Sequence, residues 1–164
     1  MPTTKKAPQE GVRDKTVVTL VGERQASKGF KFVASVPPDM CRQCKLFLAC
    51  MGKLVPGRAY IVVELKDKEH YCELYEGNVR VAKVMQSPIE ILIKPQHAIE
   101  GATMVFTGIE CEVKRCPLES SCRPEGVKKG EKVKIIGIPE DVSGQTPCKK
   151  KLRKATVLVV DPSS

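Results

Sequence analysis

Eight cysteines in this 164-residue chain fall into two similar quartets, each with three closely spaced cysteines and a fourth farther along. The quartets are Cys41, Cys44, Cys50 and Cys72, and then Cys111, Cys116, Cys122 and Cys148. Four thiolates that converge on one point are typical ligands of a zinc ion or a 4Fe–4S cluster. Because the pattern occurs twice, the sequence predicts two metal centres, one in each half of the chain.

The similarity between the halves extends beyond the cysteines, although the spacing between corresponding features drifts along the chain. Apolar runs rich in β-branched residues and bounded by turn residues are typical of strands. Such runs occupy 29–33, 58–65 and 79–84 in the first half, and 101–106, 131–138 and 155–160 in the second. We therefore predict a mostly β, internally duplicated, two-lobed protein with short helical turns after the cysteine triplets and a four-cysteine site in each repeat.

The expected organisation has three parts. Residues 1–15 form a disordered basic tail, residues 16–100 form the first repeat, and residues 101–164 form the second repeat. The first repeat includes an additional strand at 16–21 and ends with a linking strand at 89–93, between the breaks at Ser87-Pro88 and Lys94-Pro95.

The cysteines also constrain the cellular compartment. The first residues lack the apolar segment of a secretory signal, and no apolar run approaches the roughly 20 residues that span a bilayer. The sequence thus predicts a cytoplasmic protein without membrane contact. Disulfides are rare in the cytoplasm. Disulfides remain the less favoured alternative, and a hyperthermophilic origin would strengthen it.

Ligand spacing favours iron–sulfur clusters over zinc. Structural four-thiolate zinc sites usually present two short C-x2-C knuckles, whereas each quartet here is a triplet and a single cysteine. We therefore expect two 4Fe–4S clusters, with two zinc ions, or mixed occupancy, as the alternative. The fourth cysteines, Cys72 and Cys148, could be exchanged between the sites, as in two-cluster ferredoxins. His70 is a conceivable further ligand, but a loop histidine is the favoured interpretation.

Two resemblances support this interpretation. The triplet of Cys41, Cys44 and Cys50 resembles the 4Fe–4S sites of endonuclease III-type glycosylases and RecB-type nucleases, which implies a cofactor only. The segments CRQCKL (41–46), PGRAY (56–60), SPIE (87–90), AIEGAT (98–103) and CRPEG (122–126) resemble an uncharacterised archaeal protein family. Methanogens and their relatives carry that family, which is described as having two cysteine clusters proposed as iron–sulfur redox centres.

The charge distribution points to partners. The net charge is +9, and residues 123–154 hold ten Lys and Arg against four acids, a net of +6. The candidate nucleic-acid-binding residues are Lys128, Lys129, Lys149, Lys150, Lys151, Arg153 and Lys154. Such a surface could bind RNA or DNA, on the ribosome or elsewhere, or steer an acidic redox partner protein; a solvated basic face is the simplest alternative.

Catalytic signatures are missing from the sequence. It contains no Walker A loop, no G-x-G-x-x-G, no G-x-S-x-G, no H-E-x-x-H and no C-x3-C-x2-C triplet. An enzyme is therefore not indicated, although the sequence does not decide the question. We expect a small protein that uses its two centres in electron transfer or redox sensing; the alternative is a basic RNA- or DNA-binding module with structural Fe–S or zinc sites.

Overall fold

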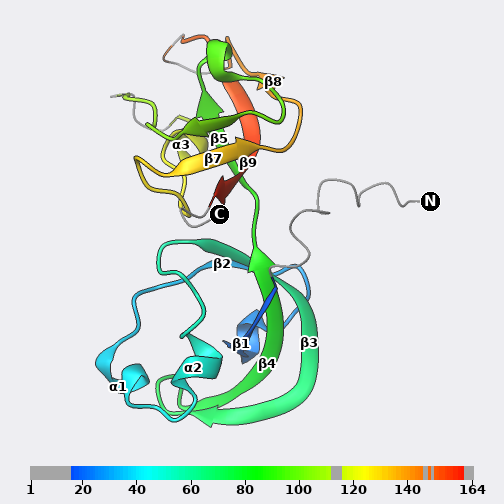
Figure 1. Cartoon of the computed structure of the whole chain (residues 1–164), viewed down its shortest axis with the longest axis vertical. Helices are drawn as coiled ribbons and strands as arrows, with labels where there is room; N and C mark the ends of the chain where they lie inside the picture. Colours follow the sequence, from blue (N-terminus) through cyan, green and yellow to red (C-terminus); the bar gives the residue numbers. More distant parts are fainter. Residues whose placement is uncertain (1–15, 112–115, 146–147, 149, 161–164) are drawn as a thin grey trace, which may run out of the picture. The chain divides into compact units, whose positions relative to one another are not determined.

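The computed structural model describes residues 16–111, 116–145, 148 and 150–160, and the chain divides between Ser87 and Pro88 into two compact units (Figure 1). The predicted tail, residues 1–15, lies outside the described residues. The described part consists of two antiparallel sheets and a few short helices, which confirms the predicted mostly β class. No helix in it is both long and apolar enough to cross a membrane.

The first unit is built on a four-stranded sheet in the order β1-β4-β3-β2. Its elements are β1 (Val17–Gly22), η3 (Glu23–Gln25), β2 (Lys31–Val33), α1 (Asp39–Arg42), α2 (Phe47–Cys50), β3 (Ala59–Cys72) and β4 (Gly77–Gln86). Val62, Ala82 and Val84 form the buried centre of its core. The rings of Phe32 and Tyr60 stack beside it with centroids 5.9 Å apart.

The second unit pairs its strands in the order β5-β9-β7-β6, with β8 added beside β9. Its elements are β5 (Ile89–Ile93), η4 (Pro95–His97), β6 (Thr103–Val105), α3 (Glu119–Cys122), β7 (Lys132–Ile135), β8 (Glu140–Asp141) and β9 (Arg153–Val160). Ile91, Val133, Ile135 and Val157 are fully buried at the centre of its main core. Alternate residues of β7 and β9 are buried, as expected for a sheet with one face against the core.

The strand β5 lies in the second sheet. Ile89 to Ile93 pair along β9, with Ile89 opposite Val157 and Ile93 opposite Arg153. The sequence pattern assigns this strand to a link at the end of the first repeat, but its apolar residues are buried in the core of the second unit. The division at Ser87 and Pro88 therefore falls before β5, ahead of the boundary expected at residue 100.

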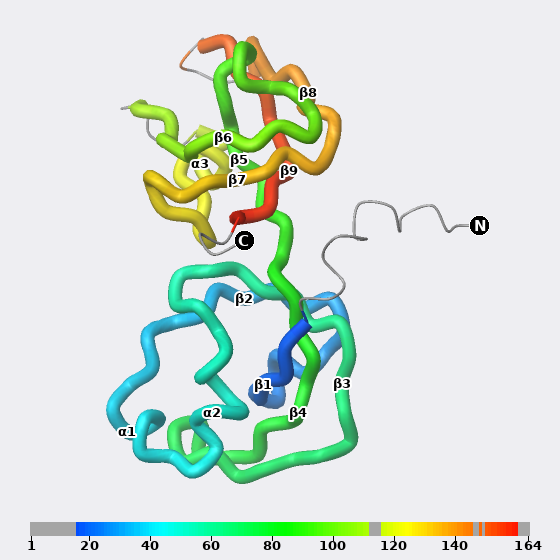
Figure 2. The backbone as a smooth tube through the Cα atoms, in the orientation of Figure 1, coloured from blue at the N-terminus to red at the C-terminus, as the bar shows by residue number. Residues whose placement is uncertain are grey.

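The hairpin of β3 and β4 is long and strongly bent (Figures 1 and 2). Its register shifts between Val62 and Glu64, and again between Leu65 and Glu69. Extra residues on one strand of a pair bend that strand and increase its twist. The hairpin regains regular pairing at its end, where Cys72 lies opposite Gly77.

Several local features of the two units correspond at one constant offset along the chain, the offset from Gly29 to Gly101. These two glycines both adopt a positive φ, 89° and 84°, a conformation that glycine reaches without steric cost. Their amides donate to the carbonyls of Val62 and Ile135, both at 2.8 Å. The helix α3 follows α2 at the same offset, and both helices end on a cysteine. The same type of backbone hydrogen bond, from a glycine amide to a strand carbonyl, therefore occurs just before β2 in the first sheet and just before β6 in the second.

Candidate metal centre

Short helical turns carry the first cysteine triplet. Cys41 lies in α1, and Cys50 is the last residue of α2. Between them the amide of Cys44 donates to the carbonyl of Cys41 at 3.1 Å, and the amide of Phe47 donates to the carbonyl of Cys44 at 3.1 Å. The helical turns therefore lie within the triplet, whereas the sequence predicted them after it. This series of helical turns brings three thiols from a short stretch of chain into one region.

The fourth cysteine of the first quartet comes from the tip of the bent hairpin, where Cys72 ends β3. Met40, Tyr71 and Leu74 line a cavity of about 720 Å³ together with three of the cysteines, Cys41, Cys44 and Cys72. His70 lines the same cavity.

The charges of the cysteines act on one another. Burial raises the pKa of the Cys50 thiol to about 11, with the negative charges of Cys72, Cys41 and Cys44 adding to the rise; a hydrogen bond to the Leu20 carbonyl opposes it. Burial and then the charges of Cys72 and Cys44 also raise the pKa of Cys41. Like charges disfavour ionisation at short range. The four thiols of the first quartet are therefore neighbours within one unit.

The helix α2 is fixed to β1 beneath this site. The hydroxyl of Thr19 donates to the backbone carbonyl of Cys50, and the Cys50 thiol lies 4.0 Å from the carbonyl oxygen of Leu20. Thr19 is 1% exposed, so its hydroxyl has no access to bulk water. These contacts fix where the end of the helix, and hence Cys50, lies over the sheet.

The second quartet is more enclosed. Cys122 ends α3 and is buried. It packs with Leu92, Val142 and Leu152 in a small apolar cluster against which Cys148 also rests. Burial raises the pKa of the Cys122 thiol, and the charges of Cys116, Cys111 and Cys148 add to the rise while Arg123 lowers it. The second quartet is therefore also gathered within its own unit.

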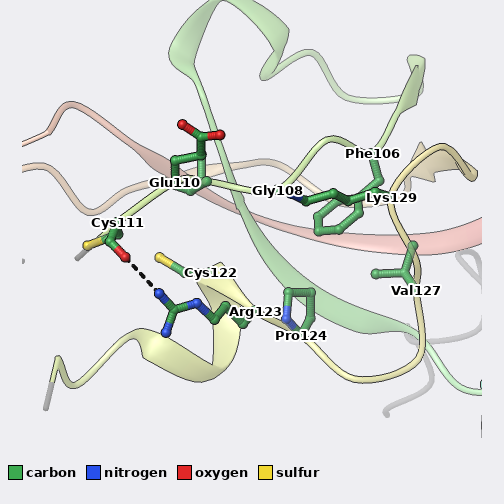
Figure 3. A pocket seen from close by; sticks show the side chains of 10 residues that line it. Phe106, Gly108, Glu110, Cys111, Cys122, Arg123, Pro124, Val127 and Lys129 are labelled. Carbon is green, nitrogen blue, oxygen red and sulfur yellow. Dashed lines mark hydrogen bonds between the residues drawn. The ribbon is translucent and has the colours of Figure 1, made fainter. Parts of the chain in front are cut away.

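Figure 3 shows Cys111 beside Cys122 in a cavity of about 590 Å³. The guanidinium of Arg123 donates to the carbonyl of Cys111 at 2.7 Å and pairs with Glu119 at 3.1 Å. Arg123 thus ties the chain at Cys111 to the helical turn that carries Cys122. No sequence pattern singles out this residue, because its partner is a backbone group in a distant loop.

One contact recurs at both sites. The amide of Leu46 donates to the Cys44 sulfur, and the amide of Leu118 donates to the Cys116 sulfur, each at 3.4 Å. The amides of Cys50 and Cys122 each donate to the carbonyl of the same leucine, Leu46 or Leu118, at 2.8 and 3.1 Å. The middle and last cysteines of the two triplets therefore have the same local geometry.

The thiols do not form a closed ligand set as they stand. Among the described residues, no three histidine, cysteine, aspartate or glutamate side chains are placed to hold a metal ion. The predicted ligand sets stay predictions, as does an exchange of Cys72 with Cys148. Every predicted ligand lies within the described part of the chain.

The described residues of the predicted basic run have different surroundings. Lys154 is half-buried and lies 3.9 Å from Glu90 and 3.7 Å from Glu140. Lys150 and Lys151 are exposed and line another cavity together with Lys94, which the sequence pattern does not single out. Lys149 lies outside the described residues. The remaining candidates are Lys128 and Lys129, which are exposed, and Arg153, which lies opposite Asp141.

Tyr75 is a further residue that the sequence pattern does not single out. Burial raises the pKa of its hydroxyl, and the charges of Cys50, Cys72 and Cys41 add to the rise. It therefore lies beside the first quartet, where the turn that follows Cys72 places it.

A small, mostly β protein with two antiparallel sheets, one in each unit, is the class that this architecture defines. The chain belongs to the family described as "Uncharacterised protein family (UPF0179)", whose model matches residues 17–159. This finding agrees with the archaeal family that the sequence resembles.

Archaeal relatives cover most of the chain. The UPF0179 protein of Pyrococcus horikoshii is 41% identical over 127 residues, which are 77% of this chain and 87% of the relative. That of Methanothermobacter thermautotrophicus is 34% identical over 146 residues, 88% of this chain and 99% of the relative. That of Methanosarcina acetivorans is 31% identical over 140 residues, 85% and 93% of the two chains. No solved structure matches the chain.

Proposed function

We propose that this chain is a cytoplasmic protein that holds two 4Fe–4S clusters and acts in electron transfer or redox sensing. Cys41, Cys44, Cys50 and Cys72 would bind one cluster. Cys111, Cys116, Cys122 and Cys148 would bind the other. The observation that supports this proposal most directly is the placement of the cysteines: Cys41, Cys44 and Cys72 line one cavity, and Cys148 packs against the cluster that contains Cys122. When bound, each cluster supplies a one-electron couple.

The residues around the thiols suit a four-thiolate group. A cluster ligated by cysteine is tuned by hydrogen bonds to its sulfurs and by solvent exposure. The amides of Leu46 and Leu118 already point at ligand sulfurs. Apolar side chains exclude water from one side of the second site. Zinc is the alternative occupant, because it also takes four thiolates.

We also propose that the two units arose by internal duplication. The shared strand order, the glycines with positive φ and the N–H to sulfur contacts support this origin. A duplicated site with a common function explains why both copies keep the middle and last cysteines in one geometry. The first and fourth cysteines depart from the offset that the middle and last cysteines share with Gly29 and Gly101.

Analysis of metal and sulfide in protein purified without oxygen tests the cofactor. We expect about eight iron atoms and about eight acid-labile sulfides per chain, and an optical change on reduction. Two zinc ions without sulfide would contradict the iron–sulfur proposal and leave the cysteine quartets as zinc sites.

The second candidate function is a basic RNA- or DNA-binding module with metal sites that stabilise the fold. The exposed lysines of the second unit favour it. Binding of nucleic acid by the metal-loaded protein, with an affinity that falls as salt rises, together with no reversible redox change, would support this candidate over the first.

A further inference from the structure

A cavity of about 900 Å³ in the second unit gathers three lysines from two distant parts of the sequence. Lys94 follows the last residue of β5, whereas Lys150 and Lys151 precede β9. Because β5 and β9 are antiparallel, with Ile93 opposite Arg153, the end of one strand meets the start of the other. The sheet itself thus brings these three lysines to one cavity.

The segment that carries two of these lysines is firmly held. Leu152 is 2% exposed, its amide donates to the Ser143 hydroxyl oxygen at 3.2 Å, and its carbonyl accepts from the amide of Val142 at 3.1 Å. Lys150 and Lys151 therefore extend from an anchored position. A pre-formed cationic site binds more tightly than one that must be ordered on binding.

The charge of the cavity is largely uncompensated. Among the described residues that line it, Glu110 alone is acidic. No ion pair within 4.0 Å to Lys94 or Lys150 is found in the described part of the chain, in contrast to Lys154 with its two glutamates. Hydrogen bonds from Ser143 lower the pKa of Asp141, and the charges of Arg153 and Lys151 add to that lowering. Asp141 is therefore an acidic neighbour of Lys151 outside the cavity lining, and that lining has three lysines against one glutamate among its described residues.

We propose that this cavity binds phosphate groups. Ammonium groups that converge in a concave site are typical of phosphate recognition. Thr107, which carries a hydroxyl, and Gly108, where φ is 77°, also line the wall. The volume lies in the range of ligand pockets, about 300–1,000 Å³, which admits a nucleotide or a short stretch of a phosphodiester chain.

The cavity also has a wall in common with the second cysteine site. Gly108, Ile109 and Glu110 line both this cavity and the one that contains Cys111 and Cys122. A bound phosphate would therefore lie against the segment that leads into Cys111. Phosphate binding does not depend on which metal the quartets hold. If the nucleic-acid candidate is correct, phosphate is the group through which the polymer would bind. If only small phosphates bind, the proposed site holds without any nucleic acid.

Titration of the full-length, metal-loaded protein at low salt tests the proposal, with pyrophosphate, ADP and a single-stranded oligoribonucleotide as probes. The variant K94Q/K150Q should weaken binding at least about tenfold, the effect of losing one charge-assisted hydrogen bond. The matched control K132Q/K134Q removes the same charge from exposed positions on β7 that do not line the cavity. It should change affinity less than about twofold. E110Q removes the acidic residue from the wall and should strengthen binding.

The outcomes separate the sources of the phosphate. Pyrophosphate or ADP that binds and displaces the oligonucleotide supports one shared phosphate site. Oligonucleotide binding alone, lost in K94Q/K150Q but kept in K132Q/K134Q, supports a site for the RNA backbone. Equal weakening by both double variants would show a diffuse basic surface and overturn the proposal. Absence of binding by every probe to the wild-type protein would overturn it as well.

Discussion

The two cysteine sites use similar helical turns but lie in different surroundings. At the first site the fourth cysteine is at the tip of a bent hairpin, and exposed apolar residues surround it, among them Met40, Tyr71 and Leu74. Leu48 on α2 is 74% exposed. At the second site Cys148 comes from a loop and rests on a small buried cluster, and Arg123 reaches the chain at Cys111.

This contrast shows which part of the site is common. The middle and last cysteines of each triplet depend on one helical turn and one amide, and both units keep them. The first and fourth cysteines depend on loops and hairpins, which differ between the units. If both sites hold the proposed clusters, the exposed apolar surround and the enclosed, arginine-flanked one should give them different reduction potentials.

The largest expected effect comes from removing one equivalent ligand from each site. Cys44→Ala and Cys116→Ala should each remove about half of the bound metal, because each cysteine belongs to a different one of the two proposed centres. A structural thiolate site contributes on the order of 10 kcal/mol of folding free energy, so each variant should destabilise its own unit. Metal analysis and hydrogen exchange of the two units measure both effects.

The exposed Ser120, which lies on α3 shortly after Cys116, provides the control for this comparison. Ser120→Ala should leave the metal content unchanged. Loss of the same centre in both cysteine variants would show that the two triplets do not serve separate sites.

A smaller effect concerns the reactivity of Cys50 in metal-free protein. Its pKa of about 11, against an ordinary 9.0, lowers the thiolate fraction at pH 8 by about 100-fold. Since the thiolate is the nucleophile, iodoacetamide should modify Cys50 about 100 times more slowly in the folded chain than in urea. Mass spectrometry of the modified peptides provides the measurement, and equal rates in the two states would contradict the burial of this thiol.

The same shift has a consequence for stability. The folded state favours the neutral thiol, so its contribution is fully present below pH 9 and is lost as the pH rises towards 11. Metal-free protein should therefore unfold at lower urea concentrations across that interval. The pKa of Cys122 is raised as well, so the second unit should lose stability in the same direction.

The smallest effect concerns a hydrogen bond that holds the helical turn of the first site and has no counterpart at the second site. Thr19→Val should destabilise the protein by about 1–3 kcal/mol, because the carbonyl of Cys50 loses its buried hydroxyl donor. The residue that corresponds to Thr19 at the offset from Gly29 to Gly101 is Ile91, which has no hydroxyl, so the second unit lacks this contact. Urea unfolding measures the change. Thr103→Val, at an exposed strand position, is the control, and an equal effect there would remove any special role for Thr19.

The mostly β class could be predicted from the sequence because apolar runs rich in β-branched residues become strands wherever one face is buried. The grouping of the cysteines by halves could be proposed for a similar reason, since spacing within a triplet is a local property. The position of Cys72 could not, because it depends on two register shifts in β3 that arise from pairing with β4. Alternation of residue types does not reveal where a strand will bulge.

The sequence pattern also could not predict which sheet β5 joins. A short apolar strand between two turns carries no sign of which sheet it joins, and its partner β9 begins only at Arg153, far along the chain. The same long-range pairing brings Lys94 to Lys150. For this reason the sequence indicates one basic surface after Cys148, although Lys154 is engaged by glutamates and Lys94 belongs with Lys150 and Lys151.

Each sheet is built from strands of one half of the chain, and this has a consequence for folding during synthesis. Every described pairing of the first sheet closes within residues 17–86, and every described pairing of the second within 89–160. At about 5–20 residues per second, a ribosome needs several seconds to add the segment from Pro88 to Ser164. Sheets of this size form in milliseconds to seconds. The amino-terminal half therefore has time to reach its fold on the nascent chain before the last strand of the other half has been made.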